Sequence, residues 1–160
     1  MSATPPQPEP VAEALARVAA APQGLLGLGM PRCAACMLLP ASLAELADAR
    51  PELVVAMGEF AGPEDWAERE RLLWPRGIHV SRNSVPALAL LVDGEVVASR
   101  AGGGPAHRIE SWIAPRLGPP ARPVPEGPTP AEREALAALE GRIAHHRAVK
   151  GWRQAGLGPA

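Results

Sequence analysis

The chain has 160 residues, a formal net charge of −1 and 47% hydrophobic residues, a composition typical of one globular domain. This balance of charge provides no basic field for nucleic acid or a membrane surface, and no apolar run reaches the roughly 18 residues of a membrane helix. We therefore expect neither nucleic acid nor a membrane as a partner. Arginine replaces lysine almost throughout, which indicates a GC-rich, bacterial source.

In the first half of the chain, predicted helices and strands alternate. Residues 1–10 contain four prolines and neither a charged nor an apolar leader, so we expect a disordered lead and a cytoplasmic protein. Pro40 lies inside a predicted helix, where it should introduce a kink. The apolar spacing predicts a helix over 11–21, a strand over 25–30, a helix over 34–49, a strand over 53–57 and a helix over 64–74.

Turn signals organise the second half. Asp93-Gly94 between two apolar runs predicts a β-hairpin, because a type I′ turn needs positive φ at both central residues. Thr129-Pro130-Ala131-Glu132 is a capping box with proline at the first helical position, and a Pro-rich linker over 118–128 precedes it. Pro115 should end the preceding helix early. The expected elements are a brief strand over 78–80, strands over 86–92 and 95–99, and helices over 107–117 and 129–150.

This order of elements predicts an α/β fold with a mixed central sheet that is flanked by helices. Early strands separated by helices favour parallel pairing, and the late hairpin adds an antiparallel edge. We expect a core domain over 11–117 and a separate C-terminal helix and tail over 129–160. On that helix, Leu136, Leu139 and Ile143 form an apolar stripe.

Cys33 and Cys36 are the only cysteines, and they form one Cys-x-x-Cys motif at the predicted start of a helix. The amide groups and the dipole at a helix N-terminus stabilise a thiolate, and the preceding Arg32 adds positive charge. A thiolate attacks a disulfide, and a second cysteine one turn further on resolves the mixed disulfide. The pattern therefore indicates Cys33 as the nucleophile and Cys36 as the resolving thiol, with no cofactor besides their disulfide.

Over roughly residues 11–117 the sequence resembles the thioredoxin superfamily. The resemblance rests on the Cys33-Ala34-Ala35-Cys36 helix entry, on Ser84-Val85-Pro86-Ala87 before an apolar strand, and on the Asp93-Gly94-Glu95 hairpin. It implies a thioredoxin-like fold, a cis Val85–Pro86 peptide facing the cysteines, and a thiol-disulfide oxidoreductase. Its partners would be a protein disulfide and a thiol reductase. The implied substrate-binding residues are Arg32, Ala34, Ala35, Val85, Pro86 and Gly102.

The sequence departs from the family at three points. The family's buried acid, six residues before the first cysteine, falls on Gly27, and Glu59 after a central strand is the candidate substitute. The intervening Ala34-Ala35 pair leaves the redox potential open. Pro40 stands one residue nearer to the cysteines than the helix proline of the family.

Two other classes of function remain open. In a non-enzymatic adaptor, the helix over 129–150 would dock a partner. The run from Gly29 to Cys36 also loosely resembles the loop of small copper-binding domains, in which soft sulfur ligands, here the cysteines with Met30 and Met37, hold Cu(I). We expect no zinc site, because no histidine has finger spacing to the cysteines.

Overall fold

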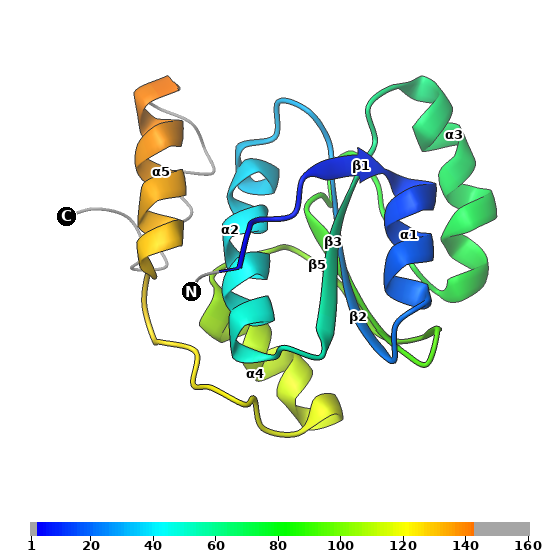
Figure 1. The fold of residues 1–160 in the computed structure, drawn as a ribbon. Coiled ribbons are helices and arrows are strands. Elements are labelled where there is room, and N and C mark those ends of the chain that lie inside the picture. The colour runs from blue at the N-terminus through cyan, green and yellow to red at the C-terminus, as the bar shows by residue number, and fades with distance from the viewer. Residues whose placement is uncertain (1–2, 143–160) are drawn as a thin grey trace.

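The computed structural model describes residues 3–142, and a five-stranded mixed sheet of order β1-β3-β2-β4-β5 lies at its centre (Figure 1). β2 pairs in parallel with β3, and β3 pairs in parallel with β1. β4 runs antiparallel to β2 and to β5. The strands are β1 (Pro8–Pro10), β2 (Gln23–Gly29), β3 (Leu53–Glu59), β4 (Ala87–Val92) and β5 (Glu95–Ala101).

Helices cover both faces of the sheet, as the sequence predicts (Figure 1). Successive side chains of a strand point to opposite faces, so β2 directs Leu26 and Leu28 to one core cluster and Leu25 to the other. The first cluster joins α1 and α3, and the second joins α2 and α4. The helices are α1 (Val11–Ala19), α2 (Ala34–Ala49), α3 (Pro63–Leu72), the 3-10 turn η1 (Trp74–Arg76), α4 (Ala106–Leu117) and α5 (Pro130–Arg142).

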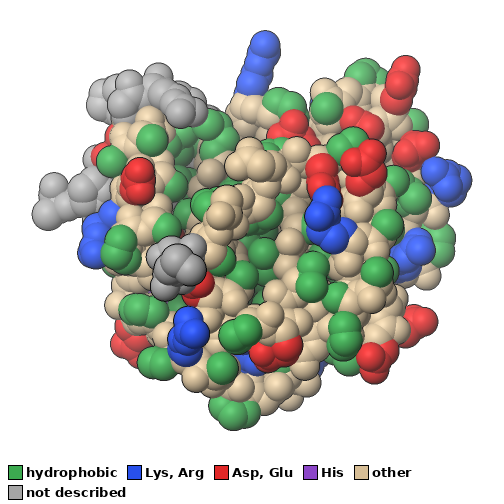
Figure 2. Space-filling model, viewed as in Figure 1, with side chains coloured by type: hydrophobic (Ala, Val, Ile, Leu, Met, Phe, Trp, Pro, Cys, Tyr) green, Lys and Arg blue, Asp and Glu red, His purple; other side chains and the backbone are tan. Residues whose placement is uncertain are grey.

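Charge is unevenly distributed on the face shown in Figure 2. Acidic and basic side chains gather over α1 and α3, whereas the surface between α2 and α1 has few charged side chains. Within residues 3–142, no helix combines the length and the apolar character that crossing a membrane requires.

The prediction of disorder is wrong for residues 8–10, which form the edge strand β1. They pair with β3 from Pro8 opposite Met57 to Pro10 opposite Glu59. An edge strand needs hydrogen bonds on one side only, so it tolerates proline, which has no N–H group. Glu9 of β1 also forms an ion pair with Arg17 of α1. The N-terminal segment is thereby held against the sheet.

Two further predictions in the second half are wrong. Residues 78–80 belong to no strand; Ile78 and Val80 are apolar because they are buried in the core cluster beneath α1 and α3. Pro115 does not end its helix, since α4 continues to Leu117. A proline in the last turn removes one helical hydrogen bond, and the buried Ile109 and Ile113 hold the helix on the sheet. The Asp93-Gly94 turn is confirmed, with φ values of 51° and 82°.

The capping box at the start of α5 is confirmed. Glu132 accepts a hydrogen bond from Thr129 N (2.9 Å), and its own N–H donates to the Thr129 hydroxyl (3.2 Å). Leu136 and Leu139 are buried, and α5 packs on the outer side of α2 (Figure 1). The Glu132 carboxylate also accepts from Ser42 of α2. The predicted Ile143, and the predicted helix beyond Arg142, lie outside the described residues.

The C-terminal end of α2 is anchored by a buried ion pair. Arg50, fully buried just after α2, donates to the Glu110 carboxylate of α4 through Nε at 2.9 Å and through Nη2. Leaving either charge unpaired inside the core costs several kcal/mol, about 3–5 in typical proteins. The pair therefore fixes α2 against α4 at the end of α2 that lies away from the cysteines.

Candidate active site

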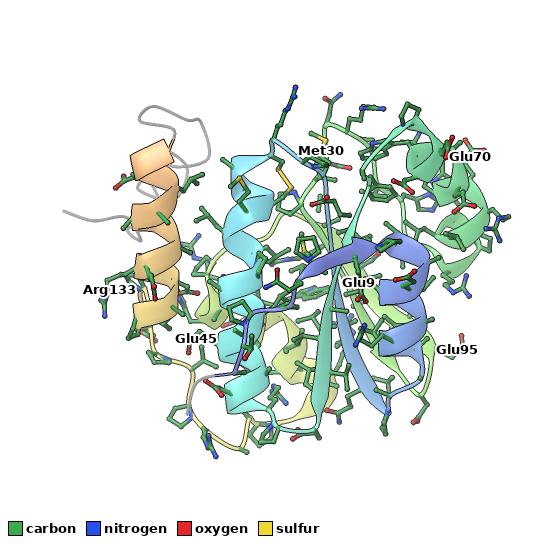
Figure 3. The ribbon with its side chains drawn as sticks, turned by 45° about the horizontal axis from the view of Figure 1, so that its top comes forward. Glu9, Met30, Glu45, Glu70, Glu95 and Arg133 are labelled. Atoms are coloured by element: carbon green, nitrogen blue, oxygen red, sulfur yellow. A yellow bond between two sulfur atoms is a disulfide. The ribbon has the colours of Figure 1, made fainter. Side chains whose placement is uncertain are left out.

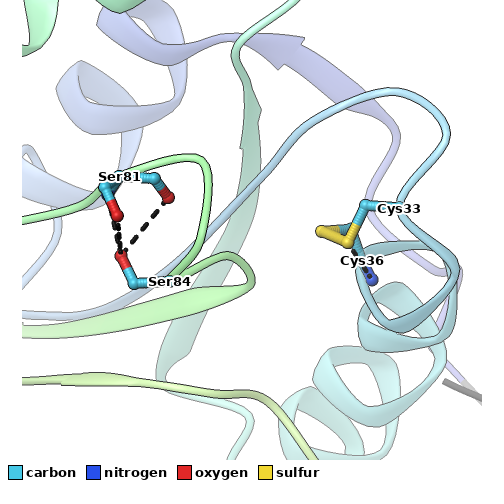
Figure 4. The surroundings of a disulfide bond; sticks show 4 residues. All are labelled: Cys33, Cys36, Ser81 and Ser84. Atoms are coloured by element: carbon cyan, nitrogen blue, oxygen red, sulfur yellow. Dashed lines mark hydrogen bonds between the residues drawn. A yellow bond between two sulfur atoms is a disulfide. The ribbon is translucent and has the colours of Figure 1, made fainter. Parts of the chain in front are cut away.

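The two cysteines form a disulfide at the start of α2, with Cα atoms 5.2 Å apart (Figure 4). Cys33 is the N-cap residue and half-buried, whereas Cys36 is in the first turn and only 4% exposed. The helix entry thus places one sulfur toward solvent and the other in the core. This asymmetry matches the predicted division into an attacking and a resolving thiol.

One backbone N–H group at the N-terminus of α2 is directed at the Cys33 sulfur. The Cys36 N–H donates to Cys33 Sγ at 3.2 Å. The first turn of α2 contains no acidic residue. A hydrogen bond to sulfur and an aligned helix dipole both favour a thiolate over a thiol. Once the disulfide is reduced, this arrangement stabilises negative charge on Cys33 rather than on Cys36.

The second half of the predicted site begins at the Val85–Pro86 bond, which is cis, the isomer that the resemblance implied. Figure 4 shows the disulfide facing the turn of Ser81 and Ser84 that leads into this bond. In that turn, Ser84 Oγ accepts from Ser81 N at 2.7 Å. Val85 and Cys33 both pack, half-buried, against the same core cluster. The fold therefore brings together two segments that lie about fifty residues apart in sequence.

Gly102 lies beside Pro86, to which its N–H donates a hydrogen bond of 2.7 Å at the carbonyl oxygen. Gly102 is exposed and has a φ of 91°, in the left-handed region that favours glycine. Arg100 donates a hydrogen bond of 2.8 Å to the carbonyl oxygen of Gly103, the residue after Gly102. Burial lowers the pKa of Arg100. The loop after β5 is thereby held against the cis proline.

The remaining predicted substrate contacts differ in exposure. Arg32 is exposed and has a φ of 62°, which is uncommon for a residue with a long side chain and is found preferentially at functional sites. Ala35 is half-buried. Ala34 is 1% exposed, because α2 turns its methyl group into the core, and its role as a substrate contact stays a prediction.

An open pocket of about 360 Å³ lies beside Cys36. We call it the methionine pocket, because all three methionines after Met1 line it; Figure 3 shows Met30 near the start of α2. The other residues that line it are Pro5, Pro6, Gln7, Pro8, Pro31, Cys36, Pro40 and Glu59. Sequence reasoning missed Met57 and the N-terminal prolines, because only the pairing of β1 with β3 brings them to Cys36.

Gly27 has no space for the acid that the family resemblance would place there. A Cβ atom at this position would lie 2.9 Å from Leu39 Cδ2, 2.9 Å from Met57 Sδ and 3.1 Å from Leu43 Cδ1. A larger side chain at this position would require the ends of these three side chains to shift, and the chain has no carboxylate there.

Among the described residues that line the methionine pocket, Glu59 is the one with a carboxylate. It is the last residue of β3 and pairs with Gly29 of β2. Paired residues of neighbouring strands share a face, and a Cβ atom on Gly29 would lie 3.1 Å from Cys36 Sγ. Glu59 thus lies on the same face of the sheet as the resolving cysteine, which keeps it the candidate for proton transfer.

No family model and no curated protein sequence matches the chain. Solved structures of thioredoxins do match it. Thioredoxin f2 from Chlamydomonas reinhardtii has a TM-score of 0.53 and 14% identity over 71% of this chain and 98% of its own. Desulfothioredoxin from Desulfovibrio vulgaris Hildenborough has a TM-score of 0.51 and 21% identity over 72% of this chain and 99% of its own.

A third match is a mutant thioredoxin from Halobacterium salinarum NRC-1, with a TM-score of 0.51, 21% identity, and coverage of 72% of this chain and 95% of its own. At these identities the likeness establishes the fold alone. The protein has a thioredoxin-like fold, and its Cys-x-x-Cys disulfide supports thiol-disulfide redox chemistry as the general class of function.

Proposed function

We propose that this protein is a cytoplasmic thiol-disulfide oxidoreductase that reduces or exchanges protein disulfides through Cys33 and Cys36. The observation that carries the proposal is the position of the pair at the N-terminus of α2. There Cys33 is partly exposed with an N–H group directed at its sulfur, and Cys36 is buried behind it.

In the proposed reaction the reduced protein transfers two electrons to a substrate disulfide. The Cys33 thiolate attacks one substrate sulfur, forms a mixed disulfide and releases the other sulfur as a thiolate. Cys36 then loses its proton, and its thiolate attacks Cys33 Sγ. This step forms the Cys33–Cys36 disulfide and releases the second substrate thiolate. A thiol reductase returns two electrons to the pair and completes the cycle.

Segments around the disulfide would orient the substrate. The backbone before Pro86 and the exposed Gly102 border the same site as Cys33, and hydrogen bonds hold both segments in place. An extended substrate chain needs such a fixed backbone edge for its attack geometry, because misplacement of the reacting sulfur slows exchange. Val85, Pro86 and Gly102 therefore keep their proposed role as substrate-binding residues.

An equilibrium redox titration tests the proposal. The full-length protein is equilibrated in dithiol buffers of graded potential, its free thiols are trapped, and the oxidised fraction is measured by mass. We expect a reversible two-electron transition, and a midpoint near roughly −270 mV would match a reducing thioredoxin. The Cys36→Ser variant is the control, because it cannot form the intramolecular disulfide. If the wild-type pair stays reduced at every potential, the proposal is wrong.

A second candidate function is Cu(I) binding, which the lining of the methionine pocket favours. Three thioethers and the Cys36 sulfur are soft ligands, and Cu(I) prefers such ligands. The reduced protein would then retain one equivalent of Cu(I) through desalting, and Cys36→Ser would abolish retention. An adaptor role for α5 has no such support, because Leu136 and Leu139 are buried within this chain.

A further inference from the structure

A second open pocket, of about 420 Å³, lies on the other side of the loop that leads to Cys33. We call it the arginine pocket, because two arginines line it. Arg32 directly precedes Cys33, and Arg82 belongs to the turn that precedes Val85–Pro86. The pocket is therefore linked along the chain to both halves of the proposed active site, although neither Cys33 nor Val85 lines it. Its other lining residues include Pro31, Phe60, Gly62 and Trp66.

The aromatic side of the pocket positions Arg82. Phe60 and Trp66 stack with ring centroids 4.2 Å apart, and the Arg82 guanidinium carbon lies 5.0 Å from the centroid of Trp66. Arg69 lies 5.5 Å from the same ring and adds a third positive charge. An arginine packed on an aromatic ring is held in place and keeps its N–H fork for a carboxylate. The N–H fork of Arg82 is thus carried on the aromatic base of the pocket, while Arg32 is exposed at its edge.

No carboxylate of residues 3–142 neutralises these donors. None of the ion pairs of that segment involves Arg32 or Arg82. Asp65 lies close by in α3, but its carboxylate accepts from the backbone N–H groups of Ala61 (2.8 Å) and Gly62 (3.1 Å). A positive pocket whose guanidinium groups have no ion-pair partner, and whose Arg32 directly precedes Cys33, is complementary to an anionic group on the substrate.

We propose that the arginine pocket selects protein disulfides that have an Asp or Glu side chain next to the reacting cysteine. This inference rests on the proposed oxidoreductase function and names its substrate class. The substrate carboxylate would lie between Arg32 and Arg82 while its neighbouring sulfur meets Cys33. Charge complementarity of this kind raises the rate of productive encounter and weakens with ionic strength.

Single-turnover reduction of matched peptides tests the inference. Three disulfide-containing peptides differ only in having Glu, Gln or Lys beside the half-cystine, and each is mixed with the reduced full-length protein. We expect the Glu peptide to react about fivefold faster than the Gln peptide at low salt, and the Lys peptide to react most slowly. Arg82→Gln should remove most of this preference and Arg82→Glu should reverse it. Arg71→Gln, an exposed arginine of α3 that lines neither pocket, is the matched control and should keep it.

The outcomes separate this inference from the function on which it rests. Equal rates for the three peptides, or a preference that survives Arg82→Glu, would overturn the inference and leave the oxidoreductase intact. If no peptide is reduced, the proposed function is wrong. Calorimetry that measures binding of the same peptides to the oxidised protein then tests the preference of the pocket without disulfide exchange. Tighter binding of the Glu peptide that Arg82→Gln abolishes supports the pocket, and equal binding contradicts it.

Discussion

The methionine pocket and the arginine pocket share Met30 and Pro31, yet their chemistry is opposite. The methionine pocket is apolar apart from Gln7 and Glu59, and the N-terminal segment of the chain forms one of its walls. The arginine pocket has positive side chains on an aromatic base. Cys36 lines the methionine pocket, whereas the arginine pocket reaches the other cysteine only through Arg32, which directly precedes Cys33.

This difference assigns a separate task to each cysteine. In the proposed reaction a substrate has to reach Cys33, and the neighbouring arginine pocket has exposed and charged residues that a partner can contact. The resolving thiol must react only after the mixed disulfide has formed, so burial keeps Cys36 from competing for the substrate. Substitutions confined to one side of the disulfide test this division of tasks.

Exchanging either cysteine for serine should give the largest effect and the clearest asymmetry. Cys33→Ser removes the nucleophile, so disulfide exchange should fall about a thousandfold or more. Cys36→Ser leaves the first step intact, so the protein should accumulate as a stable mixed disulfide with its substrate. Mass spectrometry after acid quenching measures both species. If Cys33→Ser instead accumulates the mixed disulfide, the two roles are reversed.

An acid introduced at Gly27 should test how closely α2 packs on the sheet. Gly27→Asp would place a carboxyl group where Leu39 and Met57 leave no space, so we expect a loss of stability of about 3 kcal/mol or more. Gly62→Asp is the matched control on the arginine side, since no atom lies within 4 Å of its Cβ position. Gly62 is also an N-cap, where Asp is favoured, so its effect should stay within about 1 kcal/mol. Denaturant unfolding of the oxidised variants measures both free energies of unfolding. Equal losses of stability in the two variants would contradict the packing argument.

The sequence predicted some parts of the structure well and missed others. Local chemistry determined the features that were predicted well. The Asp93-Gly94 turn needs positive φ, the Thr129–Glu132 capping box closes its own hydrogen bonds, and the Cys-x-x-Cys motif begins a helix. Each depends on contacts within four residues, so single-sequence reasoning suffices.

The features that were missed depend on distant partners. Strand β1 exists because β3 provides the hydrogen bonds that a proline-rich segment cannot provide for itself. Ile78 and Val80 alternate like a strand but are buried without pairing. The position of Arg82 above Trp66 joins a turn to a helix through a ring contact. None of these has a signature at short range, so both pockets became visible only in three dimensions.

Glu59 should matter for the second chemical step and not for the first. Glu59→Gln keeps the shape of the side chain but cannot take the proton from Cys36. We expect resolution of the mixed disulfide to slow about tenfold, somewhat below the usual contribution of a general base. Rapid quenching during a single turnover measures the formation and decay of the mixed disulfide separately. An unchanged decay rate would exclude Glu59 and leave water as the proton acceptor.

Glu45→Gln is the matched control for that experiment and should have the smallest effect. Glu45 lies on α2 toward α5, and it lines neither of the two pockets (Figure 3). Both steps of disulfide exchange should therefore proceed at the wild-type rate. Slower resolution in Glu45→Gln as well would show that Glu59 acts through the general charge of this region rather than through its position beside Cys36.

Glu45→Gln should still change stability, in a direction set by its surroundings. Burial raises the pKa of Glu45, the neighbouring Glu132 and Asp48 raise it further, and the Thr129 hydroxyl opposes them by hydrogen bonding. A raised pKa in the folded state means that stability present below the unfolded pKa is lost as pH rises through the folded pKa. At neutral pH the uncharged Gln should therefore raise Tm, by at most about 2 °C because water screens the site. Below the ordinary Glu pKa of about 4.3 the difference should disappear. Glu134→Gln, an exposed residue of α5, should show no such pH-dependent gain in the same thermal melts, and an equal gain there would attribute the effect to net charge alone.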